Sequence, residues 1–477
     1  MKKTFYLHVA RSGVFFLGLL GAAGVLAQPT AHAQPATAAA PAPALAQQLD
    51  DFVRQYEKSG RFSGTALVAG HGNILLQKGY GLANREQNRA NSADTKFRIG
   101  SLTKQFTAAL VLQLVDKGRL RLDGHVADYL PDYPQPAGGQ ITLHQLLTHT
   151  AGLPNYTAQP NFASAVMRTP HTPTQLVALF STLPLEFAPG TQYHYSNSNY
   201  VLLGAIIEKV TGKPYAQVFQ DNIAGPLKLK ATSVDVWEPA DARRAAGYET
   251  SPNGLVPAPA LDMTVPYAAG AITSTAPDLY RWSQALDGNR VLSPASKKLL
   301  FTPLKNHYAC GWIVYKAKIG AEADSTLTQE HNGRINGFSS YLVRVPQRQQ
   351  VIVLLDNHGG EALAELRQGL LRILHHQPAV AAPVPSAPVA VDQATLGTYV
   401  GVYELAPTFR ITVRQRDGRL FMQATGQSEF ETEAVSPVLF AVKGVPAQVE
   451  FAKNATGQVA RLILHQNGHA QPGAKIE

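Results

Sequence analysis

The proline- and alanine-rich stretch Gln377–Asp392 constrains the fold of this 477-residue chain more than any other sequence feature. It has too few bulky apolar side chains to pack into a core, and its prolines favour extended backbone. We therefore interpret residues 377–391 as a linker between two domains. The larger predicted domain spans residues 45–376, and the smaller one spans residues 392–477.

The N-terminus has the pattern of an export signal. Three basic residues among the first eleven precede the apolar run Val14–Leu26, and small residues at alternate positions follow. Cleavage is expected after Ala33, with Ala27 as the alternative, so residues 1–33 are a predicted signal peptide. The apolar run is shorter than the ~18 residues that a spanning helix needs. We expect a periplasmic or secreted protein without a stable membrane anchor, which begins with a disordered segment, residues 34–44.

Composition and missing motifs exclude several classes of protein. The formal net charge is +9, but the basic residues are scattered, so no nucleic-acid partner is expected. Cys310 is the only cysteine, which rules out an internal disulfide, and its neighbours predict a thiol in a strand core. His-Glu-x-x-His, Gly-x-Ser-x-Gly and phosphate-binding glycine loops are missing from the sequence. We therefore expect no metal and no cofactor.

The larger domain has strand-like sequence near both ends and helical sequence between them. Residues 45–60 have the apolar spacing of a helix, and residues 63–81 form two β runs around a Gly-His-Gly-Asn turn. Residues 338–357 predict a second hairpin, followed by an amphipathic helix over residues 360–376. The expected fold is α+β, with an antiparallel sheet built from both ends of the domain, flanking helices and an inserted helical lobe.

The smaller domain has a different pattern. Short runs of alternating hydrophobicity are separated by Asp-Gly, Lys-Gly and Asn-Gly turns. This pattern predicts a small all-β meander, closed or half-closed into a barrel. Shielding of a site, binding of a partner and added stability all remain open as its role.

A serine and a lysine stand at the start of an apolar helix in "FRIGSLTKQFTAALVLQLVDKG", residues 97–118. Ser101 and Lys104 share a helix face at this spacing, about 5–6 Å apart at Cβ. Free backbone N–H groups at a helix start can hold a developing oxyanion. Apolar neighbours disfavour the charged form of Lys104, which could then take the serine proton or support another base. The alternative is a serine cap followed by a surface lysine.

A tyrosine and an asparagine precede a second apolar helix in "YHYSNSNYVLLG". Tyr195 beside a lysine can act as a general base or acid. Asn197 presents a donor and an acceptor to a substrate amide. A helix cap made by Ser196 or Asn197 is the alternative interpretation.

The third motif lies in "EHNGRINGFSSYLVRVP", within an expected edge strand. Gly333 would let the backbone approach a ligand closely, and the N–H of Arg334 could be a second oxyanion donor. His331 is expected to be partly charged near neutral pH. The alternative is a solvent-facing histidine in a glycine-rich turn.

The three motifs occur in the order Ser-x-x-Lys, Tyr-x-Asn and His-x-Gly. With these surroundings, residues 45–376 resemble the serine β-lactamase-like family, which includes class C β-lactamases, DD-carboxypeptidases and related esterases. The resemblance extends to "LLTHTAGLP" (residues 146–154), "FAPGTQYHYSNSNYVLLGAIIEKVTG", "AAGAITSTAPDLYRW" and "HNGRINGFSS". The smaller domain resembles the β domain often appended to family members. His149, within the first of these stretches, is interpreted as a structural histidine at a helix end.

The resemblance implies roles for the motif residues. Ser101 would be the acylated nucleophile, Lys104 its activator and Tyr195 the base or a proton shuttle, while Asn197 would orient the substrate. The reaction would be attack on an amide, β-lactam or ester carbonyl, followed by hydrolysis of a covalent acyl-enzyme. Whether Lys104 or Tyr195 takes the first proton stays open.

The third motif departs from one branch of the family. The resemblance makes His331 and Gly333 the wall that receives the carboxylate or ester end of the substrate. Class C β-lactamases are associated with lysine where this chain has His331, and a neutral imidazole holds a carboxylate less well than an ammonium. We therefore expect peptide or ester cleavage ahead of β-lactam hydrolysis.

The predicted function is that of an exported serine hydrolase similar to DD-peptidases and β-lactamases. Its expected partner is a small-molecule or peptide substrate, either peptidoglycan-derived or a β-lactam. One alternative is a short-chain esterase that uses the same site. Another is a protein that binds penicillin or cell-wall fragments without turnover.

Overall fold

The computed structural model describes most of the chain from residue 42 onward. The predicted signal peptide lies outside the described residues, and so does most of the predicted linker. Helix α1 begins at Ala42, so the last residues of the segment 34–44, expected to be disordered, are helical. Among the described residues, no helix is long and apolar enough to cross a membrane. The described ranges are residues 42–235, 241–251, 254–319, 325–360, 362–379, 389–407, 409–425, 429–443, 447–454, 456–466 and 469–477.

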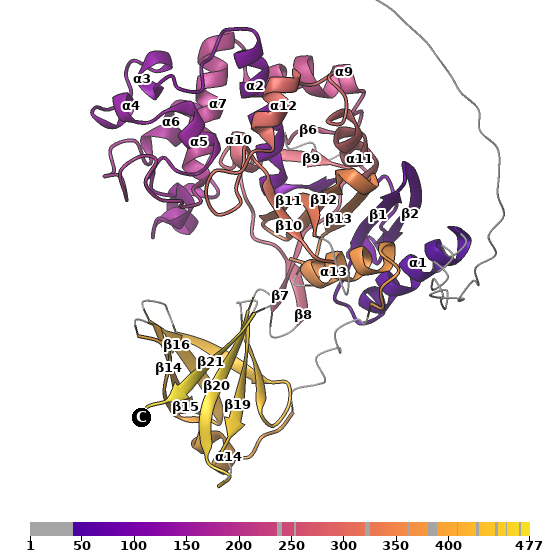
Figure 1. The fold of residues 1–477 in the computed structure, drawn as a ribbon, viewed down its shortest axis with the longest axis vertical. Coiled ribbons are helices and arrows are strands. Elements are labelled where there is room, and N and C mark those ends of the chain that lie inside the picture. Colours follow the sequence, from indigo (N-terminus) through magenta and orange to yellow (C-terminus); the bar gives the residue numbers. More distant parts are fainter. Residues whose placement is uncertain are drawn as a thin grey trace, which may run out of the picture. The chain divides into compact units, whose positions relative to one another are not determined.

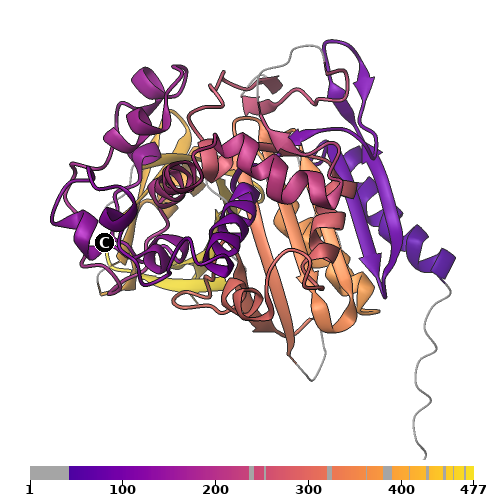
Figure 2. The same ribbon diagram turned by 90° about the horizontal axis from the view of Figure 1, so that it is seen from above.

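A six-stranded antiparallel sheet forms the centre of the larger domain (Figure 1). Strands from the two ends of the domain meet within it, because β1 pairs with β13 from Gly64 opposite Asp356 onward. Figure 2 shows these two sets of strands side by side. The predicted hairpins are both present. In spatial order the strands are β10 (Ile313–Ala317), β11 (Thr326–Ile335), β12 (Phe338–Val345), β13 (Gln350–Asp356), β1 (Gly64–Gly70) and β2 (Asn73–Tyr80).

Helices cover both faces of this sheet (Figure 1). α1 (Ala42–Lys58) and α13 (Leu363–Leu374) pack on one face, against side chains such as Val68. α11 (Ala276–Ala285) lies on the opposite face, where Leu67 is buried. Because successive strand residues point to opposite faces, the sheet divides the apolar core into two clusters.

The middle of the larger domain is mostly helical, as predicted. It contains helices α2 (Thr103–Asp116), α3 (Val126–Tyr129), α4 (Ala137–Gln140), α5 (Leu143–Leu147), α6 (Pro173–Ala178), α7 (Asn197–Thr211), α8 (Tyr215–Phe219), α9 (Gly225–Leu227), α10 (Tyr267–Gly270) and α12 (Pro294–Leu300). Short 3₁₀ or π turns are η1 (Gly100–Leu102), η2 (Tyr156–Ala158), η3 (Phe162–Val166), η4 (Gln220–Ala224) and η5 (Pro346–Arg348). Small sheets pair β5 (Phe97–Arg98) and β6 (Ser233–Val234) with β9 (Ile272–Ser274), β3 (Leu82–Asn84) with β4 (Arg89–Ala90), and β7 (Tyr248–Ser251) with β8 (Gly254–Pro257).

The smaller domain is a closed barrel, the more complete of the two expected forms. β14 pairs with both β15 and β21, which closes the ring. Its interior is filled by its own apolar cluster, in which the Tyr399 and Phe451 rings stack at 4.1 Å. The elements are α14 (Gln393–Tyr399), β14 (Gly401–Ala406), β15 (Phe409–Arg416), β16 (Arg419–Ala424), β17 (Glu429–Ala434), β18 (Leu439–Val442), β19 (Ala447–Lys453), β20 (Val459–Gln466) and β21 (His469–Lys475).

Cys310 is fully buried, but it does not lie in a strand as expected. It occupies a bend that precedes β10, and its Sγ lies 3.6 Å from the carbonyl oxygen of Leu299. Burial raises the pKa of this thiol to about 12, so the thiol stays protonated at neutral pH.

Candidate active site

Ser101 and Lys104 lie together at the start of α2. Ser101 is the middle residue of η1, the single turn that leads into the helix, and Lys104 follows on the same face. Lys104 Nζ lies 2.9 Å from Ser101 Oγ. The serine is partly exposed while the lysine is fully buried. A ligand can therefore reach the hydroxyl but not the amine.

Lys104 is held by neutral groups. Its Nζ lies 2.8 Å from Oδ1 of Asn197 and 3.0 Å from the carbonyl oxygen of Ala269 on α10. The ring faces of Tyr195 and Tyr200 are 4.9 and 5.6 Å away. Burial lowers the pKa of Lys104 well below its usual value, since desolvation disfavours the ammonium.

Tyr195 approaches the same serine from the turn before α7. Its hydroxyl donates a 2.9 Å hydrogen bond to Ser101 Oγ. Part of this side chain stays exposed, yet burial raises the pKa of its phenol. The uncharged form is therefore favoured for both groups that flank Ser101, the phenol and the amine of Lys104.

Asn197 is the first residue of α7, and its amide orientation is fixed by its neighbours. Its Nδ2 donates to Oγ1 of Thr157 at 3.1 Å, and its backbone N–H donates to Oδ1 of Asn155 at 3.1 Å. The amide oxygen is thereby turned toward Lys104. Asn197 thus holds the lysine as well as lining the site.

Gly333 permits the close packing of β11 on η1. A Cβ at this position would lie 2.0 Å from the carbonyl oxygen of Ile99 and 2.4 Å from Ser340 Oγ. Gly100 has a left-handed φ of +51°, and a Cβ at this position would lie 3.0 Å from the backbone nitrogen of Arg334. The Arg334 backbone is therefore beside the turn that carries Ser101, while its side chain is exposed.

His331 differs from the expectation of a partly charged, ligand-facing group. Only 2% of its surface is exposed. Nε2 lies 2.9 Å from the hydroxyl of Tyr308, and Nδ1 lies 2.6 Å from the carbonyl oxygen of Asn332. Burial lowers the pKa of His331 to about 3. The imidazole is therefore neutral near pH 7, and both of its nitrogens are occupied by protein groups.

β11 is the second strand of the sheet and not the edge strand that was expected. However, β10 pairs with β11 only between Thr326 and Glu330. Within the described residues, the half His331–Ile335 has a strand partner on one side only, which is β12. The expectation was wrong for the strand order, but this half of the strand has one free edge.

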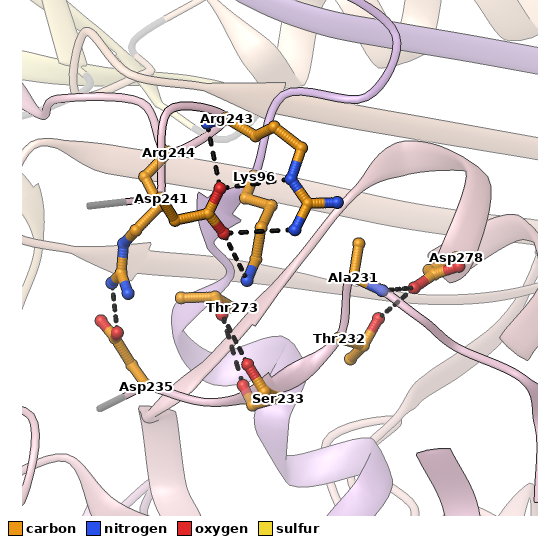
Figure 3. A network of polar contacts seen from close by, with 10 residues as sticks. All are labelled: Lys96, Ala231, Thr232, Ser233, Asp235, Asp241, Arg243, Arg244, Thr273 and Asp278. Carbon is orange, nitrogen blue, oxygen red and sulfur yellow. Dashed lines mark hydrogen bonds and ion pairs between the residues drawn. The ribbon is translucent and has the colours of Figure 1, made fainter. Parts of the chain in front are cut away.

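Ion pairs anchor the strand that leads into η1. Lys96, just before β5, pairs with Asp241 at 3.1 Å, and Arg98 on β5 pairs with Asp235 at 2.9 Å. Figure 3 shows Asp241 held by Lys96 and Arg243, and Arg244 paired with the buried Asp235. These contacts fix the backbone immediately before the serine turn.

The sequence did not identify three groups that complete the site. Tyr308 locks His331, Thr157 orients the amide of Asn197, and His149 packs its ring against that of Tyr195 at 4.2 Å. His149 lay in a stretch that supported the family resemblance, but Tyr308 and Thr157 lay in none. Among the described residues, no group of three or more His, Cys, Asp or Glu side chains could hold a metal ion.

The fold and the site together define the class of this protein. An antiparallel sheet with helices on both faces and a Ser-x-x-Lys turn beside an inner strand is a β-lactamase/transpeptidase-like fold. A family model described as Beta-lactamase matches residues 49–375, so the chain belongs to the beta-lactamase family. A second model, described as a domain of unknown function (DUF3471), matches residues 385–475.

Curated relatives agree with this assignment. Penicillin-binding protein 4* of Bacillus subtilis (strain 168) is 28% identical over 446 residues, which cover 87% of this chain and 96% of the relative. Protein flp of Staphylococcus aureus (strain MW2) is 30% identical over 345 residues, covering 69% of this chain and 67% of that protein.

Solved structures share the fold. The octameric penicillin-binding protein homologue from Pyrococcus abyssi superposes with a TM-score of 0.63 at 22% identity, covering 90% of this chain and 99% of that one. The D-stereospecific amidohydrolase from Streptomyces sp. superposes with a TM-score of 0.55 at 28% identity, covering 67% of this chain and 95% of that one. At 22% identity the first of these supports the fold alone.

Proposed function

We propose that this protein is an exported serine hydrolase that forms an acyl-enzyme at Ser101. The observation that carries the proposal is the convergence of Lys104 Nζ and Tyr195 OH on Ser101 Oγ, each at 2.9 Å. The N-terminal sequence supports export, and we propose that cleavage after Ala33 leaves a mature chain that begins at Gln34.

Hydrogen-bond counting favours Lys104 as the base. An uncharged lysine amine has two N–H donors and one lone pair. Asn197 Oδ1 and the Ala269 carbonyl can only accept, so they take the two N–H groups. The lone pair then faces Ser101 Oγ and accepts the serine proton, while Tyr195 donates to the same oxygen.

If Tyr195 were the base instead, Lys104 would be a charged ammonium beside a Tyr195 tyrosinate. Burial lowers the pKa of Lys104 and raises that of Tyr195, so it opposes both charges. The amine is therefore the group that receives the proton, and the phenol serves as a donor that relays protons.

The reaction has two balanced halves. Ser101 Oγ bonds to the substrate carbonyl carbon as its proton passes to Lys104, and the carbonyl π electrons move to the oxygen. The tetrahedral intermediate expels the leaving group, which takes a proton from Lys104 through Tyr195. Water then attacks the acyl carbonyl carbon as Lys104 takes a proton from it, and the carbonyl π electrons again move to the oxygen. When this second intermediate collapses, the bond between the acyl carbon and Ser101 Oγ breaks and Oγ takes the proton back from Lys104, which releases the acid and restores Ser101.

Two backbone N–H groups are the proposed oxyanion donors, those of Ser101 and Arg334. This assignment is supported by the packing of the Arg334 backbone on Gly100, the residue before the serine. Preorganised N–H donors of this kind contribute about 10²–10³-fold to acyl transfer.

The proposed substrate is an amide or ester carbonyl, with short D-amino-acid peptides and amides as the first choice. His331 is neutral and occupied, so it offers no cation to a substrate carboxylate. The similarity to a D-stereospecific amidohydrolase supports an amide substrate. Short esters are the second candidate, because acyl transfer from an ester uses the same groups.

Labelling of Ser101 tests the proposal directly. The protein is incubated with a fluorophosphonate and with a fluorescent penicillin, and the adduct is located by intact mass and peptide mapping. Wild type should gain one adduct on Ser101, Ser101→Ala should gain none, and the exposed control Ser164→Ala should label normally. An adduct on another residue, or none on folded wild type, would refute the proposal.

A substrate panel then separates the candidates. D-Ala-D-Ala peptides, D-amino amides, short nitrophenyl esters and cephalosporins are compared by kcat/KM. Turnover of the D-amino amides or peptides above the others supports the first choice, and faster turnover of esters supports the second. An adduct that never turns over on any member would identify a binding protein instead.

A further inference from the structure

His149 occupies an unusual position two residues after α5. Its surface is fully buried, and its backbone φ of +55° lies in the left-handed region that side chains rarely adopt. Such a conformation persists only where the surroundings stabilise it, and it often accompanies function. The contacts of His149 explain what holds it there.

One residue, His149, contacts three consecutive residues around the phenol that approaches the serine. Its carbonyl oxygen accepts a 3.0 Å hydrogen bond from the N–H of His194. Its ring Nδ1 accepts a 3.3 Å bond from the N–H of Ser196. Between them, the Tyr195 ring packs on the imidazole with centroids 4.2 Å apart and planes inclined by 36°.

The same ring nitrogen also contacts the first turn of α7. Asn199 Nδ2 lies 2.9 Å from His149 Nδ1, and the side chain of the N-cap residue Ser196 makes no capping hydrogen bond. The imidazole thus accepts the backbone N–H of the N-cap residue Ser196 and contacts the side chain of Asn199 in the first turn of the helix.

These bonds require one form of the imidazole. A nitrogen that accepts two N–H bonds carries no proton, so the proton of the neutral ring is on Nε2. Burial lowers the pKa of His149 well below its usual value. Four tyrosine rings contact this imidazole, those of Tyr193, Tyr195, Tyr200 and Tyr308, and the basic groups that interact with it electrostatically are Lys104, His331 and His194.

We propose that His149 is a positioning residue for Tyr195. It holds the Tyr195 ring over Lys104 and keeps the Tyr195 hydroxyl hydrogen-bonded to Ser101. The inference rests on the proposed function, since it assigns His149 a role in that acylation. The Tyr195 ring, 4.9 Å from Lys104 Nζ, helps to keep water from the amine. When the imidazole is lost, the phenol shifts and the amine is better solvated.

This predicts a change that a purely structural residue would not cause. Acylation needs the neutral amine, so its rate rises with pH through the pKa of Lys104. Better solvation moves that pKa up toward its usual value, and the midpoint of the pH–rate profile moves to higher pH. A loss of folded protein alone would lower the amplitude of labelling and leave the midpoint in place.

Two substitutions separate the contributions of the ring and the acceptor. His149→Asn keeps an acceptor near the Nδ1 position and tolerates positive φ, but it removes the ring. His149→Phe keeps a ring and removes the acceptor. His144→Asn is the matched control, because His144 is a half-buried histidine on α5 itself, five residues earlier.

The measured quantities are fluorophosphonate labelling rates from pH 5 to 10, kcat and KM on the best substrate, and the folded fraction by circular dichroism. We expect His149→Phe to lose about 100-fold in labelling rate and in kcat, with KM changed by less than about threefold. His149→Asn should lose about tenfold, and both midpoints should move up. The control should match wild type.

Folded His149→Phe that labels at the wild-type rate, or loses rate without a midpoint shift, would overturn the proposal. If His149→Phe does not fold, the same readouts on His149→Asn decide. A readout free of catalysis is the ¹⁵N spectrum of histidine-labelled wild type, which should show the Nε2–H tautomer of His149 from pH 5 to 8. The Nδ1–H tautomer would overturn the inference, whereas unlabelled wild type would overturn only the proposed function.

Discussion

The hydroxyl of Tyr308 lies 2.9 Å from Nε2 of His331, so this nitrogen of the third motif is occupied by a protein group and does not face a ligand. The imidazole faces a phenol on one side and the carbonyl oxygen of Asn332 on the other, with no surface left for a carboxylate. A histidine expected from sequence to meet the substrate is therefore part of the wall behind the site. This arrangement changes the pH dependence expected of it.

His331 should affect stability in acid and not activity near neutrality. Its pKa of about 3 in the folded protein lies below the usual value of 6.5, so the unfolded chain binds an extra proton between these values. The stability that this neutral imidazole contributes is present above pH 6.5 and is lost as the pH falls. In His331→Gln, the slope of unfolding free energy between pH 4 and 6 should be smaller by about 1.4 kcal/mol per pH unit. Urea titrations at several pH values measure this slope, and equal slopes would contradict the buried neutral state.

Lys104→Met should abolish most of the reactivity of Ser101. The variant keeps the length of the side chain and removes the lone pair that we propose takes the serine proton, so labelling should slow by about 10³-fold or more. In wild type, the labelling rate should rise with pH and level off well below pH 10.5, because burial lowers the pKa of the amine. Lys298→Met, at an exposed position on α12, is the control. Wild-type labelling rates in folded Lys104→Met would show that the pair is structural.

Tyr195→Phe should be less damaging than Lys104→Met. The phenylalanine keeps the ring that packs on His149 and covers the lysine, and it removes only the hydroxyl that donates to Ser101. A lost proton relay predicts a decrease of about 10²-fold in labelling rate. Equal losses in the two variants, measured under the same conditions, would assign the base to Tyr195 instead.

Much of the fold could be predicted because local patterns determine it. Short, nearly continuous apolar runs predict β1 and β13, and the Gly-His-Gly-Asn turn predicts the hairpin of β1 and β2. The position of β11 in the sheet could not be predicted, because it depends on the pairing of β10 with Thr326–Glu330, and neither strand has a sequence signal for its neighbour. The closure of the barrel depends likewise on β14 meeting β21.

In the candidate site, too, local features could be predicted from the sequence and long-range contacts could not. Ser101 and Lys104 are three residues apart, so helix geometry alone brings them together. The neutrality of His331 depends on its burial, and its Nε2 contacts Tyr308, which lies 23 residues away in a segment without a recognisable motif. Burial and hydrogen-bond partners arise from packing between distant segments, and a motif contains no information about them.

The barrel should be dispensable for the chemistry of Ser101. Its buried cluster consists of its own side chains, and the larger domain has separate clusters on the two faces of its sheet. A chain that ends after residue 379 should therefore fold and label within about twofold of the full-length rate. Thermal unfolding followed by circular dichroism checks the fold. A folded truncation that labels more than about tenfold slower would place the barrel in the function of the site.

Gly333→Ala should damage both stability and reactivity, because no space exists for a methyl group. The added Cβ would lie 2.0 Å from the Ile99 carbonyl oxygen, so either β11 or the turn that carries Ser101 must move. Overpacking of this kind costs about 1–3 kcal/mol, and a shift of about 1 Å at the serine lowers reactivity about 10²-fold. Gly288→Ala is the control, since a Cβ there would meet no atom within 4 Å. Urea unfolding and Ser101 labelling measure the two effects, and a Gly333→Ala protein as stable and as reactive as Gly288→Ala would contradict the close packing of β11 on η1.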